Sequence, residues 1–234
     1  MTFRASLLTA VAAFVTLGLV LGSGPTLKGQ GPRGTAALMD PAELKEQAPA
    51  TFKVNFDTSA GLFVIEVPRD WAPRGADRFY NLVKRGFYDG CRFYRVMPGF
   101  MAQFGLNGDP AVIKIWLDAT PPTPGIPRAR IPDDPRGKQS NKKGIVTFTA
   151  TGLDRRSTLI FINLADNLLM DRQTIPFGQV VSGMNVVEKL YSGYGELAPS
   201  GNGPDLNRLY SEGNAYLEKE FPKFYFIKTA TIVP

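Results

Sequence analysis

The stretch FKVNFDTSAGLFVIEVP, residues 52–68, contains two runs of alternating apolar and polar residues on either side of a turn. In the first run, Val54 and Phe56 are separated by polar residues. Successive side chains of a strand point to opposite faces of a sheet, so this alternation is typical of strands with one buried face. The turn at Thr58–Gly61 joins the two runs, and the stretch predicts a β-hairpin.

Further short strands are expected along most of the chain, because alternating or strongly apolar runs recur between turn residues. They fall within residues 91–105 (interrupted at Pro98-Gly99), 144–152, 157–166, 175–181 and 223–233.

Two helices are predicted between these strands. In residues 72–90, Pro73 begins a helix whose apolar residues recur at spacings of three and four, and Gly86 ends it. Residues 182–193 show a second apolar helix face. Many short strands with only two good helices favour a mainly β fold, a closed β-barrel, over a βαβ fold.

Two segments, residues 110–143 and 192–213, are rich in Pro or Gly and lack clear periodicity. We interpret them as long excursions, which are usually functional or mobile. Asp133 and Asp134 in the first excursion are interpreted as turn formers rather than an acid–base pair.

Composition limits the chemistry that the chain can perform. The 234 residues are 44% hydrophobic, which suffices for one domain with a proper core or at most two small ones. Histidine is absent, so Ser-His and Cys-His catalytic pairs and histidine metal sites are excluded. Cys91 is the only cysteine, which excludes an internal disulfide and a Cys-rich zinc site. We expect no metal or cofactor, and we interpret Cys91 as a small buried residue rather than a nucleophile.

The formal net charge is +6, but Lys and Arg are scattered along the chain. We interpret them as a solvated basic surface and expect no nucleic-acid partner.

The first 24 residues are interpreted as a targeting segment. Arg4 precedes an uncharged run from Ala5 to Gly24, which is typical of an export signal. An uncleaved membrane anchor through residues 5–24 is the alternative, because the run is borderline in length for a bilayer span. Residues 25–50 are interpreted as a linker, in which Asp40 caps a short helix, and residues 51–234 as the folded domain. We expect a periplasmic or secreted protein, or one held at the inner membrane.

Four motifs carry a resemblance to a known family: FYRVMPGFMAQFG (93–105), GIVTFTATG (144–152), STLIFINLADN (157–167) and IPFGQVVSGMNVVEKL (175–190). The chain resembles the cyclophilin family of peptidyl-prolyl cis-trans isomerases over about residues 52–232. The resemblance implies a closed eight-stranded antiparallel barrel with a helix over each end. The long loops look like a bacterial, exported branch.

The resemblance also implies the site residues. Arg95 takes the position of the catalytic arginine, and Gln103 orients it or holds the substrate carbonyl. Phe100 and Met101 line the site, and Phe161 forms the floor of the proline pocket. Taken alone, such a strand would more often be core packing with one surface charge.

Five further positions take part in substrate binding in the family, and here they depart from its pattern. Thr149 and Ala150 replace an alanine and an asparagine, Leu159 replaces a glutamine, Leu169 a tryptophan and Thr174 a histidine. Leu159 removes a side-chain amide that would help bind the substrate backbone. We expect altered substrate binding and weaker activity without loss of the catalytic group.

The predicted function is that of an enzyme that accelerates X-Pro bond rotation and assists protein folding. Proline-containing peptides and unfolded proteins are the expected partners, and the enzyme is expected to be a monomer. The reaction needs no histidine, because it forms no covalent intermediate and requires no general acid or base. Two alternatives remain open: a catalytically weak barrel that binds proline peptides, and a scaffold that docks a partner through its two excursions.

Overall fold

The computed structural model describes residues 33–117, 129–149 and 152–233. Within these ranges, eight strands form one antiparallel sheet in the order β3-β4-β6-β5-β7-β2-β1-β8. Their bounds are β1 Thr51–Thr58, β2 Gly61–Pro68, β3 Arg95–Met97, β4 Met101–Phe104, β5 Ile145–Phe148, β6 Ile160–Asn163, β7 Pro176–Ser182 and β8 Ile227–Val233.

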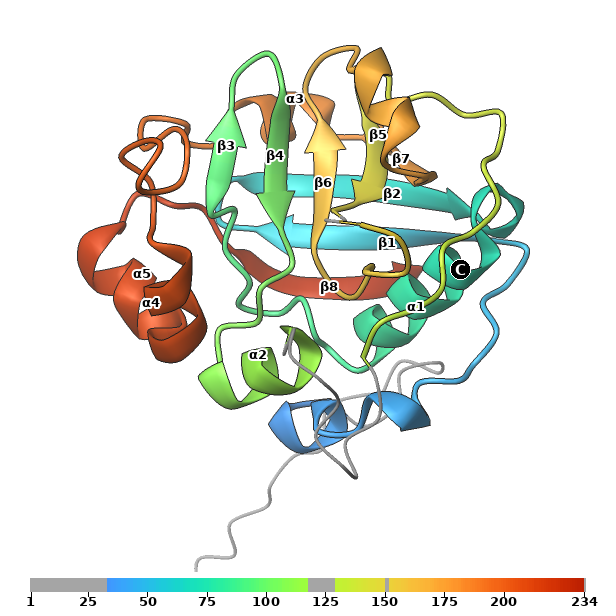
Figure 1. The fold of residues 1–234 in the computed structure, drawn as a ribbon, viewed down its shortest axis with the longest axis horizontal. Helices are drawn as coiled ribbons and strands as arrows, with labels where there is room; N and C mark the ends of the chain where they lie inside the picture. Colours follow the sequence, from blue (N-terminus) through green and yellow to red (C-terminus); the bar gives the residue numbers. More distant parts are fainter. Residues whose placement is uncertain (1–32, 118–128, 150–151, 234) are drawn as a thin grey trace, which may run out of the picture.

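The sheet curls into a half-barrel. In Figure 1, β3, β4, β6 and β5 run across the direction of β2, β1 and β8, and β4 and β6 pass in front of β2. The predicted mainly β fold is confirmed, but the closed barrel is wrong, because the edge strands β3 and β8 are not neighbours in the sheet. The segment before β3 is joined to the start of β8 by one bridge, Arg92–Phe226, and by a few backbone hydrogen bonds, such as the one from the Gly90 N–H to the Ile227 carbonyl at 2.7 Å. The physical reason is the shortness of β3, which spans three residues before the turn that contains Gly99.

The hairpin at the start of the domain is confirmed. Thr58 faces Gly61 at the end of β1 and β2, as the alternation predicts. Val54 and Phe56 are fully buried. Gly61 adopts a φ of 130°, a backbone conformation that L side chains rarely adopt, which explains the glycine at this turn.

The first predicted helix is also confirmed, as α1 (Pro73–Lys84), with Gly86 following at a positive φ. Its buried Phe79 lies against three aromatic rings of the sheet, Phe52, Phe56 and Phe177, at centroid distances of 6.3, 6.2 and 5.1 Å. Helix α1 therefore covers one end of the aromatic core.

The second predicted helix is present as α3 (Met184–Glu188) but is only five residues long. The expectation of just two helices is wrong, because the described residues also contain α2 (Pro110–Leu117), α4 (Leu206–Glu212) and α5 (Asn214–Glu220). These helices are too short to show a clear period in the sequence. Helix α2 buries Val112 and Trp116 in the main core. Helices α4 and α5 are stabilised by a second apolar cluster, which consists of Tyr94, Leu106, Leu209, Tyr216, Leu217, Phe221 and Phe224.

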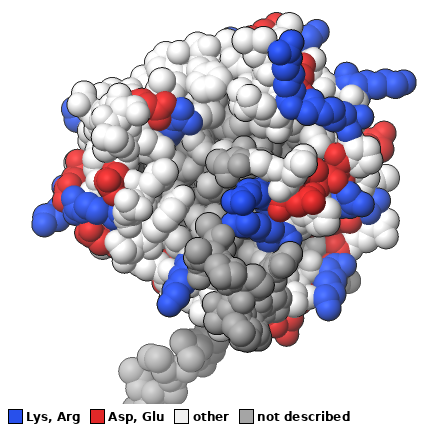
Figure 2. All heavy atoms as spheres, in the orientation of Figure 1, with Lys and Arg blue, Asp and Glu red and all other residues white. Residues whose placement is uncertain are grey.

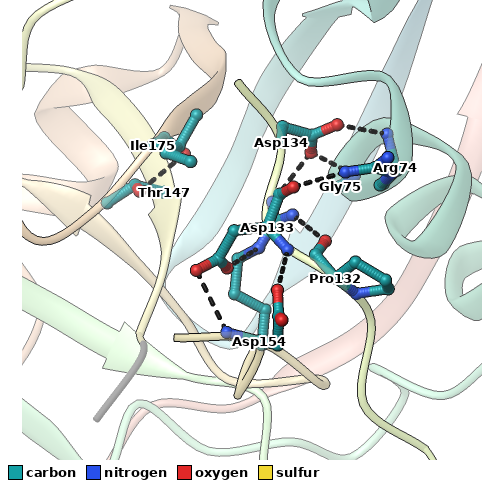
Figure 3. Close-up of polar contacts among 9 residues, drawn as sticks. Arg74, Gly75, Pro132, Asp133, Asp134, Thr147, Asp154 and Ile175 are labelled. Atoms are coloured by element: carbon teal, nitrogen blue, oxygen red, sulfur yellow. Dashed lines mark hydrogen bonds and ion pairs between the residues drawn. The ribbon is translucent and has the colours of Figure 1, made fainter. Parts of the chain in front are cut away.

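The first excursion is anchored by its two aspartates. Asp134 accepts hydrogen bonds from the backbone N–H groups of Arg74 (2.8 Å) and Gly75 (3.0 Å), and so caps α1 from a distant loop. Arg156, which is 2% exposed, pairs with Asp133 at 2.8 Å and with Asp134 at 2.9 Å. Figure 3 shows Asp133 and Asp134 between the start of α1 and the segment around Asp154. The two carboxylates therefore hold the excursion to the domain.

The described part of the expected linker, residues 33–50, lies against the domain. It contains two 3-10 turns, η1 Thr35–Leu38 and η2 Pro41–Glu43, and Asp40 caps the second as predicted. The Trp116 indole donates a hydrogen bond to the Leu38 carbonyl at 2.8 Å. The boundary at residue 50 stays a prediction.

The predicted export signal or anchor, residues 1–24, lies outside the described residues. Among the residues that the structure describes, no helix is both long and apolar enough to cross a bilayer.

The face shown in Figure 2 carries Lys and Arg at many separate places, often next to Asp or Glu. Twelve ion pairs join described residues, and most of them lie at least partly in solvent. This view favours the interpretation of a mixed, solvated surface.

Cys91 is fully buried, and burial raises the pKa of its thiol well above the ordinary value. The thiolate is the reactive form, so we expect a thiol-reactive dye to label the native protein far more slowly than the protein in denaturant. Rapid labelling of the native protein, followed by absorbance, would contradict this burial.

Candidate active site

Three predicted site residues lie in one row across neighbouring strands. Arg95 on β3 faces Gln103 on β4, and Gln103 faces Phe161 on β6. Directly opposite residues of antiparallel strands project from the same face of a sheet. The alternate residues of β4, Ala102 and Phe104, belong to the main core. The row therefore projects from the other face of the sheet.

Hydrogen bonds orient the polar members of this row. The Arg95 Nη1 donates to the Gln103 Oε1 at 3.1 Å. The Gln103 Nε2 donates to the Thr149 Oγ1, also at 3.1 Å. Thr149 thus orients the amide, and the amide oxygen holds a guanidinium whose side chain is 19% exposed.

The apolar residues of the site lie beside this row. Met101 and Phe161 are almost fully buried, although neither belongs to the two apolar clusters of the interior. Phe100 is half-buried and lies in the turn before β4, where its N–H donates to the Met97 carbonyl at 3.0 Å. Because Phe100 precedes the strand, the alternation of β4 does not decide its direction.

Thr149 and Leu159, two of the positions at which the sequence differs from the family pattern, lie together. The Thr149 N–H donates to the Leu159 carbonyl at 2.9 Å. Both residues line a cavity of about 180 Å³, which Trp116, Arg155 and Tyr210 also line. Thr149 therefore connects the Gln103 amide to this cavity.

Residues 53–203 match the family described as cyclophilin type peptidyl-prolyl cis-trans isomerase/CLD. The chain belongs to the cyclophilin family. The match includes every residue of the row and the short strands that position it.

Curated relatives carry the same family name. The chain is similar to a peptidyl-prolyl cis-trans isomerase-like 1 of Rhizopus delemar, with 36% identity over 59% of this chain and 79% of the relative. A bacterial peptidyl-prolyl cis-trans isomerase, from Acinetobacter baylyi, is 31% identical over 63% of this chain and 76% of the relative. The resemblance to cyclophilins is confirmed, and the exported branch stays a prediction.

The other three residues of this cyclophilin that were predicted to bind the substrate lie outside the row. Leu169 lies on the 3-10 turn η4 (Leu168–Arg172) and is 78% exposed. Thr174 is buried and donates to the Met170 carbonyl at 3.1 Å, while it accepts from Asn141 at 3.2 Å. Ala150 lies outside the described residues. The roles of all three in substrate binding stay predictions.

A chain of asparagine side chains supports the turn at Phe100 in this cyclophilin, and the sequence interpretation missed it. Asn167 Nδ2 donates to the Phe100 carbonyl at 2.8 Å and to the Asn163 Oδ1 at 2.7 Å. Asn163 in turn donates to the Asn141 Oδ1 at 3.1 Å. The asparagines at the end of FIN and in LADN were the available signal, because polar amides after an apolar strand need buried partners.

Glu196 is the second residue that the sequence interpretation missed. Its Oε2 accepts a hydrogen bond from the Arg95 Nη2 at 2.5 Å, across 101 positions of sequence. This bond lowers the pKa of Glu196, against the opposing effect of burial. The second excursion of this cyclophilin therefore brings a carboxylate to Arg95, the predicted catalytic residue, and no periodicity in that segment indicates this contact.

Proposed function

We propose that this chain catalyses the cis–trans isomerisation of X-Pro bonds in peptides, with Arg95 as the catalytic residue. The proposal depends on one observation above all, the row in which Arg95, Gln103 and Phe161 share one face of a cyclophilin sheet. The guanidinium of Arg95 and the ring of Phe161 then lie on either side of the Gln103 amide, whose oxygen accepts a hydrogen bond from the guanidinium.

The reaction rotates one amide bond, for which resonance sets a barrier of about 18–20 kcal/mol. Rotation breaks the conjugation and returns a lone pair to the proline nitrogen. A donor that binds the twisted bond more strongly than the planar forms lowers this barrier. Arg95 is suited to this role, because a guanidinium stays charged and offers several N–H groups in one plane.

The neighbouring residues have complementary roles in the proposal. Gln103 orients Arg95 through its amide oxygen and is itself oriented by Thr149. Met101 and Phe161 hold the proline ring by apolar contact, so that the rest of the peptide turns about it. The flexible thioether of Met101 suits a wall that accepts rings of different pucker.

Leu159 gives a direct test of the altered substrate site. We expect Leu159→Gln to retain or raise kcat/KM in a protease-coupled assay with a proline peptide, because it restores an amide to the cavity shared with Thr149. Leu159→Asn, which places a shorter amide at the same position, is the matched control for reach. A Leu159→Gln enzyme slower than wild type would show that this position does not bind the substrate backbone.

A weakly catalytic binding module is the second candidate function, and the apolar Leu159 favours it. Exchange spectroscopy by NMR on a bound proline peptide separates the two. Cis–trans exchange faster than in the free peptide supports the enzyme, whereas binding with unchanged exchange supports the binding module.

We further propose that the enzyme acts outside the cytoplasm on unfolded clients, as a monomer. Its support is the charged and apolar pattern of residues 1–24. Fractionation of cells that express the full chain tests this location. Recovery of the protein in the cytoplasmic fraction, at its full mass, would contradict export.

A further inference from the structure

Glu196 lies in the second excursion, in the segment between α3 and α4 that passes beside β3 in Figure 1. Its carboxylate and the Gln103 amide bind different terminal nitrogens of Arg95. The third nitrogen, Nε, is buried and has no hydrogen-bond partner among the described residues. The guanidinium is thus held at both of its terminal nitrogens.

The carboxylate is itself held by its own loop. Glu196 Oε1 accepts from the Leu197 N–H at 2.8 Å, and the Glu196 carbonyl accepts from the Gly203 N–H at 2.7 Å. A Cβ at Gly201 or Gly203 would lie 2.5 or 2.6 Å from that carbonyl oxygen, so glycine is required for this tight turn. The loop therefore presents a fixed carboxylate rather than a mobile one.

The loop is also anchored to the domain. Leu197 lies against the second apolar cluster, to which Tyr94, the residue before Arg95, also belongs. The cluster therefore connects the carboxylate and the catalytic strand through one set of apolar contacts.

We propose that Glu196 is a positioning residue for prolyl isomerisation, which acts through Arg95; this inference rests on the proposed function. Long side chains lose rotamer freedom when they act, and a guanidinium already held at two nitrogens has less to lose. Each terminal nitrogen carries a second N–H group, so the two contacts leave one N–H on each of them for the substrate. Because the pKa of Glu196 is lowered from 4.5, the carboxylate is ionised at all pH values above that ordinary value, and the contact persists there.

Two variants of the full chain, Glu196→Ala and Glu196→Gln, test the role. We expect Glu196→Ala to lower kcat roughly 10-fold with little change in KM, because misplacement of a reacting group by about 1 Å can cost on the order of 100-fold. Glu196→Gln should lose less, since its amide oxygen can still accept from Nη2. Exchange spectroscopy at saturating peptide gives kcat, and its concentration dependence gives KM.

The matched control is Glu218→Ala. Glu218 lies on α5 and also pairs with an arginine, Arg92, at 2.7 Å, and neither residue belongs to the row. We expect this control to keep the wild-type kcat. Thermal unfolding of each variant shows that the compared proteins are folded.

A double variant distinguishes positioning from a general effect on the fold. In an Arg95→Ala background, Glu196→Ala should change kcat by less than about twofold, because its effect passes through the arginine. An equal loss in both backgrounds would overturn the inference, as would a Glu196→Ala enzyme as fast as wild type or faster. A rate unchanged by Arg95→Ala alone would contradict the proposed function itself. A rate that falls with Arg95→Ala but not with Glu196→Ala would contradict only the inference about Glu196.

Discussion

Arg95→Ala is expected to lower kcat/KM for a proline peptide by roughly 100-fold or more. The estimate follows from the loss of about 100- to 1,000-fold that accompanies removal of one donor aimed at charge developing in a transition state. The same change leaves the apolar residues Met101 and Phe161 in place. The loss should therefore fall mainly on kcat, and peptide binding measured by NMR titration should change much less.

Arg95→Lys is the informative companion. It keeps the positive charge but loses the planar fork that can reach Gln103 and Glu196 together. We expect it to recover only part of the lost rate.

The control for Arg95→Ala is Arg85→Ala, which removes a half-buried arginine at the end of α1, on another part of the domain. Wild-type activity no higher than that of Arg95→Ala would contradict the proposed mechanism.

Asp134→Ala is expected to have the largest effect on stability, a decrease of about 3 kcal/mol in the free energy of unfolding. Asp134 and Arg156 are 1% and 2% exposed at the side chain, and removal of one partner of a buried pair costs about 3–5 kcal/mol. We expect the lower end of that range, because Arg156 keeps its contact with Asp133. The change also removes the acceptor for two N–H groups at the start of α1 (Figure 3).

Denaturant titration followed by circular dichroism measures this decrease. Asp57→Ala is the matched control, because Asp57 pairs with Lys228 at 3.3 Å while both side chains are about half exposed. We expect that control to cost less than about 1 kcal/mol. Equal losses in the two variants would show that the Asp134 pair is no more important than a surface pair.

Much of the fold could be predicted from the sequence because its strongest signals are local. Alternation in residues 52–68 indicated the hairpin, and Pro73 and Gly86 marked the limits of α1. The short helices α4 and α5 were missed for the converse reason. Each spans seven residues, and each is stabilised by packing against a cluster whose members come from distant parts of the chain.

The candidate site divides in the same way. The resemblance of the motifs to the family indicated Arg95, Gln103 and Phe161, and the strand register brings these three residues into one row. The departures at Thr149 and Leu159 could be read from the sequence as well, but their shared cavity could not. The depth of a side chain, its orientation and its neighbours depend on how separate strands are placed side by side.

By itself, the sequence determined the mainly β character of this protein, its family and the choice of Arg95 as the predicted catalytic residue. Periodicity and motifs are properties of neighbouring residues, so they can be read without the fold. Only the tertiary structure decided that the sheet stays open at one edge and that Glu196 contacts Arg95. The same holds for Asp134, which caps a helix that begins about 60 residues before it. Ion pairs and caps form wherever the folded chain brings charge and backbone groups together, and the distance between them along the sequence carries no signal of that meeting.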